Sequence, residues 1–349
     1  MSSKILKEDT EQFASHFELS SSLKGKSFLI TGATGLIGSV MIKCLLELER
    51  QERLGLKIVA VVRNIDKAKK VLGGDFESVM IVQHPLNDIN ALKIGAIDYL
   101  VHLASPTASK YFVEHPVETL CTAIDGTMAA LEYVKTNKVK AMVYASSLEV
   151  YGSNLSDEIL NEEFQGYVNP IEVRSSYNVG KRASECLCHS YAEEYGVNVM
   201  IARMTQTFGA GVDYNDNRVF AQFARKVIEG EDIELHTAGK TCRMYCYTTD
   251  AISALLYVLL KGERGKAYNI ANKESYISVY DMAQMVRDVF SPETSIKVEK
   301  KNDLGYAPET KLRLDTTRVE SLGWMPRYGL VEMYARLLND FRAIKEQYE

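Results

Sequence analysis

A glycine-rich segment between an apolar run and a helix-like stretch constrains the fold of this chain most. It follows the strand-like run Ser27–Ile30, opens the helix-like stretch Leu36–Arg53, and reads Thr31-Gly32-Ala33-Thr34-Gly35-Leu36-Ile37-Gly38. Its glycines permit a tight turn, close approach of backbone to phosphate and close packing of helix on strand. Because the N–H groups that open a helix attract anions, the segment predicts a dinucleotide pyrophosphate site. The residues assigned to it are Gly32, Thr34, Gly35, Leu36, Ile37 and Gly38.

Apolar, β-rich runs alternate with helical patterns through the first two thirds of the chain. The runs are Ser27–Ile30, Lys57–Val62, Val79–Val82, Tyr99–Leu103, Ala141–Ala145 and Val197–Ile201. Helices are expected at Asp9–Phe17, at Val113–Lys135 with Pro116 in the first turn, and at Tyr177–Tyr195, which ends at Gly196. Near-continuous apolar strands separated by helices indicate a parallel sheet covered on both faces. We predict an α/β fold, a Rossmann-type doubly wound parallel sheet.

Beyond Gly209 the pattern becomes mixed. Helical stretches are expected at Asn217–Glu229, Tyr280–Val289 and Leu330–Tyr348, with a short extended run at Ile233–Leu235. We expect three parts: an N-terminal helical extension over 1–24, a mainly dinucleotide-binding domain over 25–208, and a smaller mixed α/β substrate-binding subdomain over 209–349. The third part is expected to be interleaved with the second.

Composition narrows the partners. The chain has 41 basic and 46 acidic side chains, a net charge of −5 and no block of Lys or Arg, which argues against nucleic acid and favours small molecules. No apolar run reaches the length of a membrane span and the N-terminus is polar, so we expect a cytoplasmic protein without a membrane segment. The six cysteines include no C-x-x-C, and the histidines are scattered, so we expect free thiols and no metal site.

The ends of the expected strands supply further cofactor residues. Arg63 follows the second strand, where an acid would grip the adenosine ribose of NAD(H). A guanidinium there suits a 2′-phosphate, so NADP(H) is favoured over NAD(H), although Arg63 can instead stack on the adenine or stay solvated. Asp88 and Ile89 are expected at the adenine edge. Ala104 and Ser105 follow the fourth strand and are expected beside the pyrophosphate and the nicotinamide ribose.

A Y-x-x-x-K pair marks the expected reacting centre. On a helix Tyr177 and Lys181 are neighbours on one face. An adjacent ammonium and an oxidised nicotinamide both favour phenolate, so Tyr177 can exchange a proton with a sugar hydroxyl while hydride moves to or from the cofactor. The alternative is an ordinary surface pair of tyrosine and lysine.

The fifth expected strand ends close to two more polar side chains, Ser147 and Glu149. A period of two puts them on the same side if the strand continues that far. Ser147 can then hydrogen-bond the reacting hydroxyl and Glu149 can act as a second base. The alternatives are a strand-end cap for Ser147 and a solvated carboxylate for Glu149.

Together these motifs resemble the extended short-chain dehydrogenase/reductase family, whose members modify nucleotide-activated sugars. The resemblance covers about residues 25–335, and within the family the motifs are most similar to those of UDP-glucuronate decarboxylases. The matching segments are Thr31–Gly38, His102–Pro106, Ser147–Gly152, Gly166–Ile171, Arg174–Tyr177, Gly180–Arg182, Thr207–Gly209, Asn217–Val219 and Arg243–Tyr247.

The resemblance implies a shared first step, in which Tyr177 deprotonates the sugar O4 and hydride leaves C4 to give a 4-keto sugar. Decarboxylation, epimerisation or dehydration can follow. It also implies a functional Glu149 and a homodimer built through the helices that begin near Val113 and Tyr177, packed as a four-helix bundle. Arg243 would clamp the substrate diphosphate. The other implied substrate contacts are Thr107, Tyr111, Gln206 and Arg218.

Three departures from the family pattern leave the reaction open. Leu148 replaces the polar or acidic residue that dehydratases use, which argues against 4,6-dehydration; Gln206 replaces Asn; and Arg63 replaces an acid. We therefore place a decarboxylase or epimerase ahead of a dehydratase. An NADPH-dependent reductase that converts a nucleotide-linked keto sugar to a nucleotide-activated alcohol is the second hypothesis. A third is a cofactor-sensing or scaffold protein, although such proteins usually lose the Tyr or the Lys.

Overall fold

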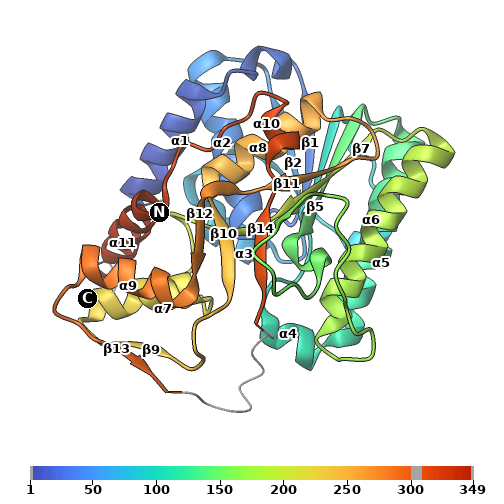
Figure 1. Cartoon of the computed structure of the whole chain (residues 1–349). Coiled ribbons are helices and arrows are strands. Elements are labelled where there is room, and N and C mark those ends of the chain that lie inside the picture. The colour runs from blue at the N-terminus through green and yellow to red at the C-terminus, as the bar shows by residue number, and fades with distance from the viewer. Residues whose placement is uncertain (1–2, 300–308, 347–349) are drawn as a thin grey trace.

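The computed structural model describes residues 3–299 and 309–346, and within them a seven-stranded parallel sheet forms the centre of the fold (Figure 1). The strand order is β3-β2-β1-β4-β5-β7-β11. The order reverses direction at β1 and β4, which opens a crevice at their carboxyl ends. The strands are β1 (Ser27–Thr31), β2 (Lys57–Val62), β3 (Met80–Gln83), β4 (Tyr99–His102), β5 (Ala141–Ser147), β7 (Val199–Met204) and β11 (Ala267–Ile270).

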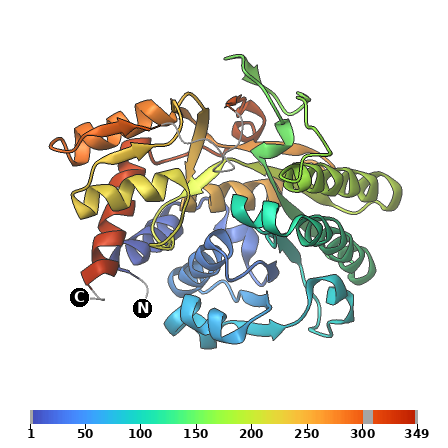
Figure 2. The same cartoon turned by 90° about the horizontal axis from the view of Figure 1, so that it is seen from below.

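Alternate residues of the strands pack into two separate hydrophobic cores, one on each face of the sheet. Phe28 and Ile30 of β1 face the core beneath α2 (Leu36–Glu52) and α8 (Thr248–Lys261). Leu29 faces the opposite core, beneath α5 (Pro116–Asn137) and α6 (Ser175–Tyr195). Figure 2 shows the helices on both sides of the sheet. The predicted α/β, doubly wound fold is confirmed, and all six predicted strands are present; β11 and α8 were not predicted.

A second, smaller region packs around Phe208 and Tyr245. Its larger sheet has the order β12-β10-β14-β6 with β8 paired to β10, and β9 pairs with β13. In the chain, β6 of this region lies between β5 and β7 of the seven-stranded sheet. After β10 the chain returns to the seven-stranded sheet with α8 and β11. The elements are β6 (Ile159–Leu160), β8 (Gln206–Phe208), α7 (Val219–Glu229), β9 (Ile233–Leu235), β10 (Cys242–Tyr247), β12 (Asn272–Ser278), α9 (Val279–Phe290), β13 (Ile296–Val298), β14 (Lys311–Leu314) and α11 (Leu330–Glu346). The predicted end of the last helix, Tyr348, lies outside the described residues.

The N-terminal helix α1 (Lys4–His16) is longer at its start than the predicted Asp9–Phe17 and lies beside both α2 and α11 (Figures 1 and 2). Its buried Asp9 accepts hydrogen bonds from Tyr247 and from Arg336. The helix therefore contacts the large sheet's layer and the smaller region together. The remaining short elements are η1 (Ser20–Leu23), α3 (Ile65–Leu72), η2 (Gly73–Ser78), η3 (Leu86–Ala91), α4 (Ser109–Glu114), η4 (Leu148–Tyr151) and α10 (Thr317–Glu320).

Two predicted elements were wrong in detail. The helix predicted over Val113–Lys135 is two helices, α4 and α5, because Pro116 at the first position of α5 restricts His115 to a non-helical conformation. The fifth strand ends at Ser147, so Glu149 does not continue its alternation but lies in the 3₁₀ turn η4. The hydroxyl of Ser147 accepts a hydrogen bond from the Glu149 N–H at 3.2 Å and caps that turn.

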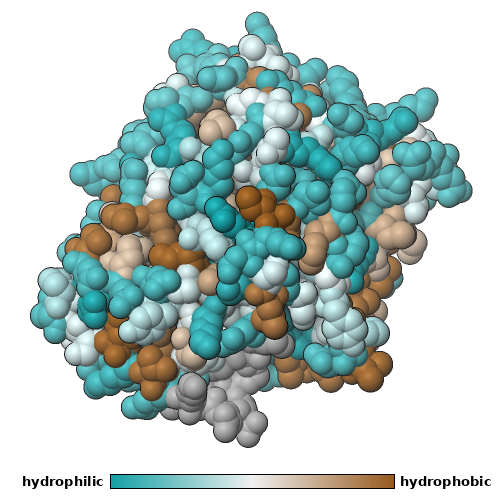
Figure 3. Space-filling model, in the orientation of Figure 1, coloured by the Kyte–Doolittle hydropathy of each residue, from teal (hydrophilic) through white to brown (hydrophobic). Residues whose placement is uncertain are grey.

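Hydrophilic side chains cover most of the face drawn in Figure 3. Hydrophobic side chains gather at its lower right, near α4 and α5, and at its lower left, over the smaller region. Across the part of the chain that the structure describes, no helix combines the length and apolar character that crossing a bilayer requires.

Candidate active site

The glycine-rich turn lies at the carboxyl end of β1 and can accept only glycine at two positions. Gly32 has a φ of +69°, and a Cβ added there would lie 2.6 Å from the carbonyl carbon of Leu103. A Cβ at Gly38 would lie 2.4 Å from the carbonyl oxygen of Gly32. Gly35 is the N-cap residue of α2, and Leu36 opens the helix. The bare backbone and the helix N-terminus together fit a dinucleotide pyrophosphate.

The ends of the neighbouring strands border the same crevice. The hydroxyl of Thr31 accepts hydrogen bonds from the N–H groups of Leu103 and Ala104, at 3.2 and 3.4 Å, which fixes the turn after β4. Ser105 follows in that turn and donates to the carbonyl of Pro106 at 3.1 Å. Arg63, directly after β2, is exposed.

Of the two residues predicted at the adenine edge, Asp88 is exposed and Ile89 is not. The side chain of Ile89 is fully buried in the core beneath α5, so only its backbone is available to a nucleotide. The 3₁₀ turn η3 points the Ile89 side chain toward the sheet, and the placement of Asp88 and Ile89 at the adenine edge stays a prediction.

Tyr177 and Lys181 lie one turn apart on α6, as predicted. The Lys181 ammonium is 5.7 Å from the centroid of the Tyr177 ring and donates to the carbonyl of Ala145 on β5 at 2.7 Å. Burial raises the pKa of Tyr177 to about 12, against a hydrogen bond from Ser147 that lowers it. Burial also lowers the pKa of Lys181 to about 8. Burial therefore outweighs the hydrogen bond from Ser147 and the charges of Arg174 and Arg218, and it favours the neutral phenol of Tyr177.

Glu149 lies in a cluster of donors. Its carboxylate is 3.8 Å from the Arg243 guanidinium, 3.6 Å from that of Arg174 and 3.2 Å from the Asn178 amide nitrogen. Burial alone would raise the pKa of Glu149, but Arg243, Arg174 and Asn178 together hold it below the usual value. Glu149 is thus a partly buried carboxylate whose charged form is favoured, and its charge raises the pKa of Tyr177.

Several polar atoms around this cluster are buried without a hydrogen-bond partner within the described residues. Such atoms are rare in folded proteins, and they leave hydrogen-bonding capacity for water or a polar ligand. They are Nε of Arg174, Oδ1 of Asn178, Oε1 of Gln206 and Nη1 of Arg243. The arrangement offers donors and acceptors together, which suits a hydroxylated, anionic molecule better than an apolar one.

Three other predicted substrate residues have surroundings of their own. Thr107 is exposed, and Tyr111 packs its ring against His115 with centroids 4.6 Å apart. Arg218 forms an ion pair with Asp216 at 2.6 Å, although its charge still lowers the pKa of Tyr177.

Sequence reasoning missed three residues of the site. Arg174 and Asn178 contact Glu149, and Phe112 stacks on Tyr177. The positions of Arg174 and Asn178 close to Tyr177 in the sequence were a signal for the first two. No local pattern links Phe112 to Tyr177, because the two are far apart in sequence.

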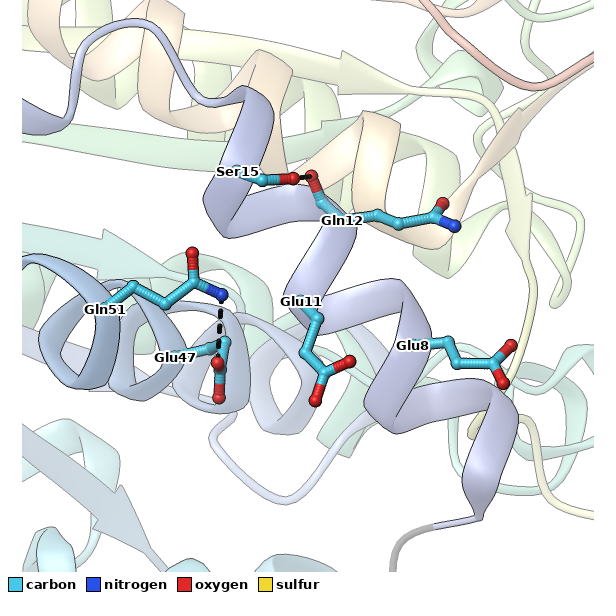
Figure 4. A pocket seen from close by; sticks show the side chains of 6 residues that line it. All are labelled: Glu8, Glu11, Gln12, Ser15, Glu47 and Gln51. Carbon is cyan, nitrogen blue, oxygen red and sulfur yellow. Dashed lines mark hydrogen bonds between the residues drawn. The ribbon is translucent and has the colours of Figure 1, made fainter.

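An open hollow of about 410 Å³ lies between α1 and α2, away from these residues (Figure 4). It borders the last turns of α2, whereas the glycine-rich turn opens the first. Its lining is acidic, which disfavours a pyrophosphate. The lining residues are Glu8, Glu11, Gln12, Ser15, Glu47 and Gln51. Within residues 3–299 and 309–346, no group of three or more His, Cys, Asp or Glu is arranged to hold a metal ion.

Three features of this chain are typical of extended short-chain dehydrogenases. They are the glycine-rich turn after β1, the switch point in the parallel sheet and the Tyr-Lys pair on α6. The chain belongs to the NAD dependent epimerase/dehydratase family, whose model matches residues 28–271. The resemblance inferred from the sequence is thereby confirmed, and with it the expectation of an NAD(P)-dependent enzyme.

Curated relatives extend the match over most of the chain. UDP-glucuronic acid decarboxylase 6 of Arabidopsis thaliana is 31% identical over 329 residues, which are 90% of this chain and 88% of the relative. UDP-glucuronic acid decarboxylase 1 of Danio rerio is 30% identical over 318 residues, 88% of this chain and 70% of the relative.

Solved structures show the same fold. The UDP-glucose 4-epimerase of Thermotoga maritima matches with a TM-score of 0.76 and 22% identity, covering 93% of this chain and all of the other. A dTDP-glucose 4,6-dehydratase of Streptomyces venezuelae, solved with NAD bound, matches with a TM-score of 0.77 and 21% identity, covering 93% and 99%.

Proposed function

We propose that this chain modifies a nucleotide-linked sugar by moving a hydride between sugar C4 and a nicotinamide cofactor, through a 4-keto intermediate. The observation that carries the proposal is the group formed by Ser147, Glu149, Tyr177 and Lys181 where β5 meets α6. Relatives named as UDP-glucuronic acid decarboxylases support the substrate class.

In this proposal Tyr177 exchanges a proton with the sugar O4, and Ser147 hydrogen-bonds the same oxygen. When bound, the nicotinamide supplies the hydride acceptor and a positive charge. That charge favours the phenolate form of Tyr177, whose pKa burial otherwise raises to about 12. Lys181 donates one hydrogen bond to the Ala145 carbonyl, and its remaining ammonium donors would hold the cofactor ribose. Glu149 is the second base.

The remaining polar groups are proposed substrate ligands. The unpartnered Nη1 of Arg243 and Oε1 of Gln206 support contacts with substrate oxygens. Thr107 and Tyr111 are further proposed substrate contacts, and we propose that Arg218 assists Arg243 in binding the diphosphate.

Among the fates of a 4-keto sugar, decarboxylation or epimerisation is proposed ahead of dehydration. Leu148 is 4% exposed and lies in a hydrophobic cluster with Met244 and Leu312. It brings no acid to the site, so a leaving hydroxyl would lack a proton donor there.

The test is a panel of UDP-, GDP-, CDP- and dTDP-linked hexoses and uronic acids, followed by NMR with and without added cofactor. A new sugar resonance pattern with catalytic cofactor supports the proposal. No change with any of them would overturn it. Stoichiometric loss of NADPH absorbance would instead favour the net reductase, for which Arg63 and Leu148 are the favouring observations.

For the cofactor we propose NADP(H) over NAD(H), because the exposed Arg63 guanidinium follows β2 where a 2′-phosphate would lie. Calorimetric titration of Arg63→Ser should show at least about tenfold weaker NADP⁺ binding, because one contact with the 2′-phosphate is lost. NAD⁺ binding should be unchanged, because NAD⁺ lacks that phosphate. Equal binding of NADP⁺ to both proteins would contradict this preference.

We also propose a homodimer through α5 and α6 and a location in the cytoplasm. Val113, Val117 and Met128 are exposed on α4 and α5, where Figure 3 shows hydrophobic side chains gathered. The free state of all six cysteines suits a reducing compartment. Sedimentation of the protein at micromolar concentration should give the mass of two chains, and a Val117→Glu variant the mass of one.

A further inference from the structure

The helix that carries Tyr177 also holds the turn that carries Glu149. The amide nitrogen of Asn178 donates to the carbonyl of Glu149 at 2.8 Å, and Nε of Arg182 donates to the carbonyl of Val150 at 2.7 Å. A second arm of Arg182 donates to the carbonyl of Gly166 at 2.7 Å. Asn178 and Arg182 are one turn apart on α6, so the backbone of η4 is fixed to this helix at two successive carbonyls.

Asn178 also contacts the side chain of Glu149, in addition to the backbone of η4. The same amide nitrogen lies 3.2 Å from Oε2 of Glu149, so it donates to both the main chain and the side chain of one residue. Asn178 is 8% exposed, and its own Oδ1 is buried without a partner. Because both neighbouring atoms of Glu149 are acceptors, the nitrogen and not the oxygen of the amide must face them.

We infer that Asn178 is a positioning residue, which fixes the Glu149 carboxylate relative to α6, the helix that carries Tyr177. The inference rests on the proposed function, since Glu149 matters to the reaction only if Tyr177 does. Through Asn178 the helix α6 sets both members of the acid-base pair, and a shift of one moves the other.

The charged and titratable groups near Glu149 come from three places in the fold. Arg243 belongs to β10, and its guanidinium is 3.8 Å from the Glu149 carboxylate. Arg174 directly precedes α6, and its guanidinium is 3.6 Å from that carboxylate. Tyr177 belongs to α6, and its pKa responds to the charge of Glu149. Both guanidiniums are farther from Glu149 than a direct hydrogen bond, whereas Asn178 is within that distance. The Asn178 amide therefore makes the shortest of these three side-chain contacts with the carboxylate.

Asn178→Ala removes both donated bonds, and Asn178→Asp replaces the donor by a second carboxylate of the same shape. The matched control is Asn198→Asp, an exposed asparagine that donates to the carbonyl of Lys140 at 3.0 Å. Each full-length protein is labelled with ¹³C at the glutamate carboxyl and titrated by NMR, with Glu149→Gln to assign the resonance. This measurement needs no substrate.

The pKa of Glu149 should rise by about one unit in Asn178→Ala and more in Asn178→Asp, and stay unchanged in Asn198→Asp. With the substrate found by the panel above, the acidic limb of the kcat profile should move up in pH by the same amount, with little change in KM. An unchanged Glu149 titration in both Asn178 variants would overturn the inference. An inactive wild type would count against the proposed function alone, because the titration reports on Asn178 by itself.

Discussion

The rings of Phe112 and Tyr177 lie face to face, with centroids 4.2 Å apart and planes 8° apart. Phe112 belongs to the short helix α4, and its carbonyl accepts a hydrogen bond from Ser176 at 3.3 Å. One face of the proposed catalytic phenol is therefore covered by a residue from a different segment of the chain. This cover contributes to the desolvation that raises the pKa of Tyr177 to about 12.

Replacing Phe112 by Ala should lower the pKa of Tyr177 from about 12 toward 10, because water then reaches the ring. Titration of ¹³Cζ-labelled tyrosine by NMR, with Tyr177→Phe to assign the resonance, measures the shift. Phe112→Leu, which keeps most of the apolar bulk, should give a smaller shift. The control is Phe76→Ala in η2, and an unchanged Tyr177 titration in Phe112→Ala would show that the stacking does not set this pKa.

Replacing Tyr177 by Phe should reduce kcat by about 100- to 10,000-fold, the usual range for loss of a proton-transferring group. The ring and its stacking remain, so dinucleotide binding and the unfolding midpoint in urea should stay close to wild type. Tyr167→Phe is the control, since Tyr167 is 69% exposed. Turnover of Tyr177→Phe at the wild-type rate would rule out the proposed role of the phenol.

Much of the large sheet could be predicted because its strands are continuous apolar runs. β2 and β9 match their predicted bounds, and the five other predicted strands of the large sheet match within a few residues. The missed strand β11 is short and is followed almost at once by β12, so its boundary carries little local signal. The strands that pair across the smaller region, such as β10 with β8, depend on partners far apart in sequence.

In the site, too, the features that depend on local sequence could be predicted, and those that depend on distant segments could not. Glycines 32 and 38 could be predicted because their role is local: a Cβ would collide with backbone only a few residues away or on the next strand. The setting of Glu149 could not, since it depends on where β5 stops and η4 begins. The partners of its carboxylate come from β10 and α6, which meet only in the folded chain.

A buried ion pair beside the site should carry a large stability effect. Arg203 of β7 contacts both carboxylate oxygens of Glu185 on α6, with the closest pair 2.7 Å apart, and Ser146 donates to the same carboxylate. Arg203→Met leaves that carboxylate buried and uncompensated, which should cost about 3–5 kcal/mol in urea unfolding.

The double variant Arg203→Met/Glu185→Leu should lose less stability than Arg203→Met alone, because neither charge is then left without its partner. Lys297→Ala removes an exposed pair with Asp232 and serves as the control, with little expected change. Additive losses in the double variant would show that the two residues do not act as a pair.

The last prediction concerns Asp250, a buried carboxyl that links α8 to the segment before α11. Its Oδ2 accepts from the N–H groups of Arg327 and Tyr328 at 2.9 and 3.0 Å. Burial raises the pKa of Asp250 to about 7, from 3.8 in the unfolded chain, and raises that of Asp9 to about 6. The folded state therefore keeps these protons where the unfolded state has lost them.

Because the folded pKa is the higher one, the stability that Asp250 contributes is complete below about pH 4 and is lost as pH rises toward 7. Asp250→Asn keeps an acceptor oxygen but cannot ionise, so its unfolding free energy should fall less between about pH 5 and about pH 8 than that of wild type. Asp232→Asn is the control: the pKa of Asp232 is lowered, so that carboxyl is ionised in both states throughout this window and the slope should not change. Urea unfolding at several pH values measures the slopes, and equal slopes for Asp250→Asn and wild type would show that Asp250 is ionised in the folded protein.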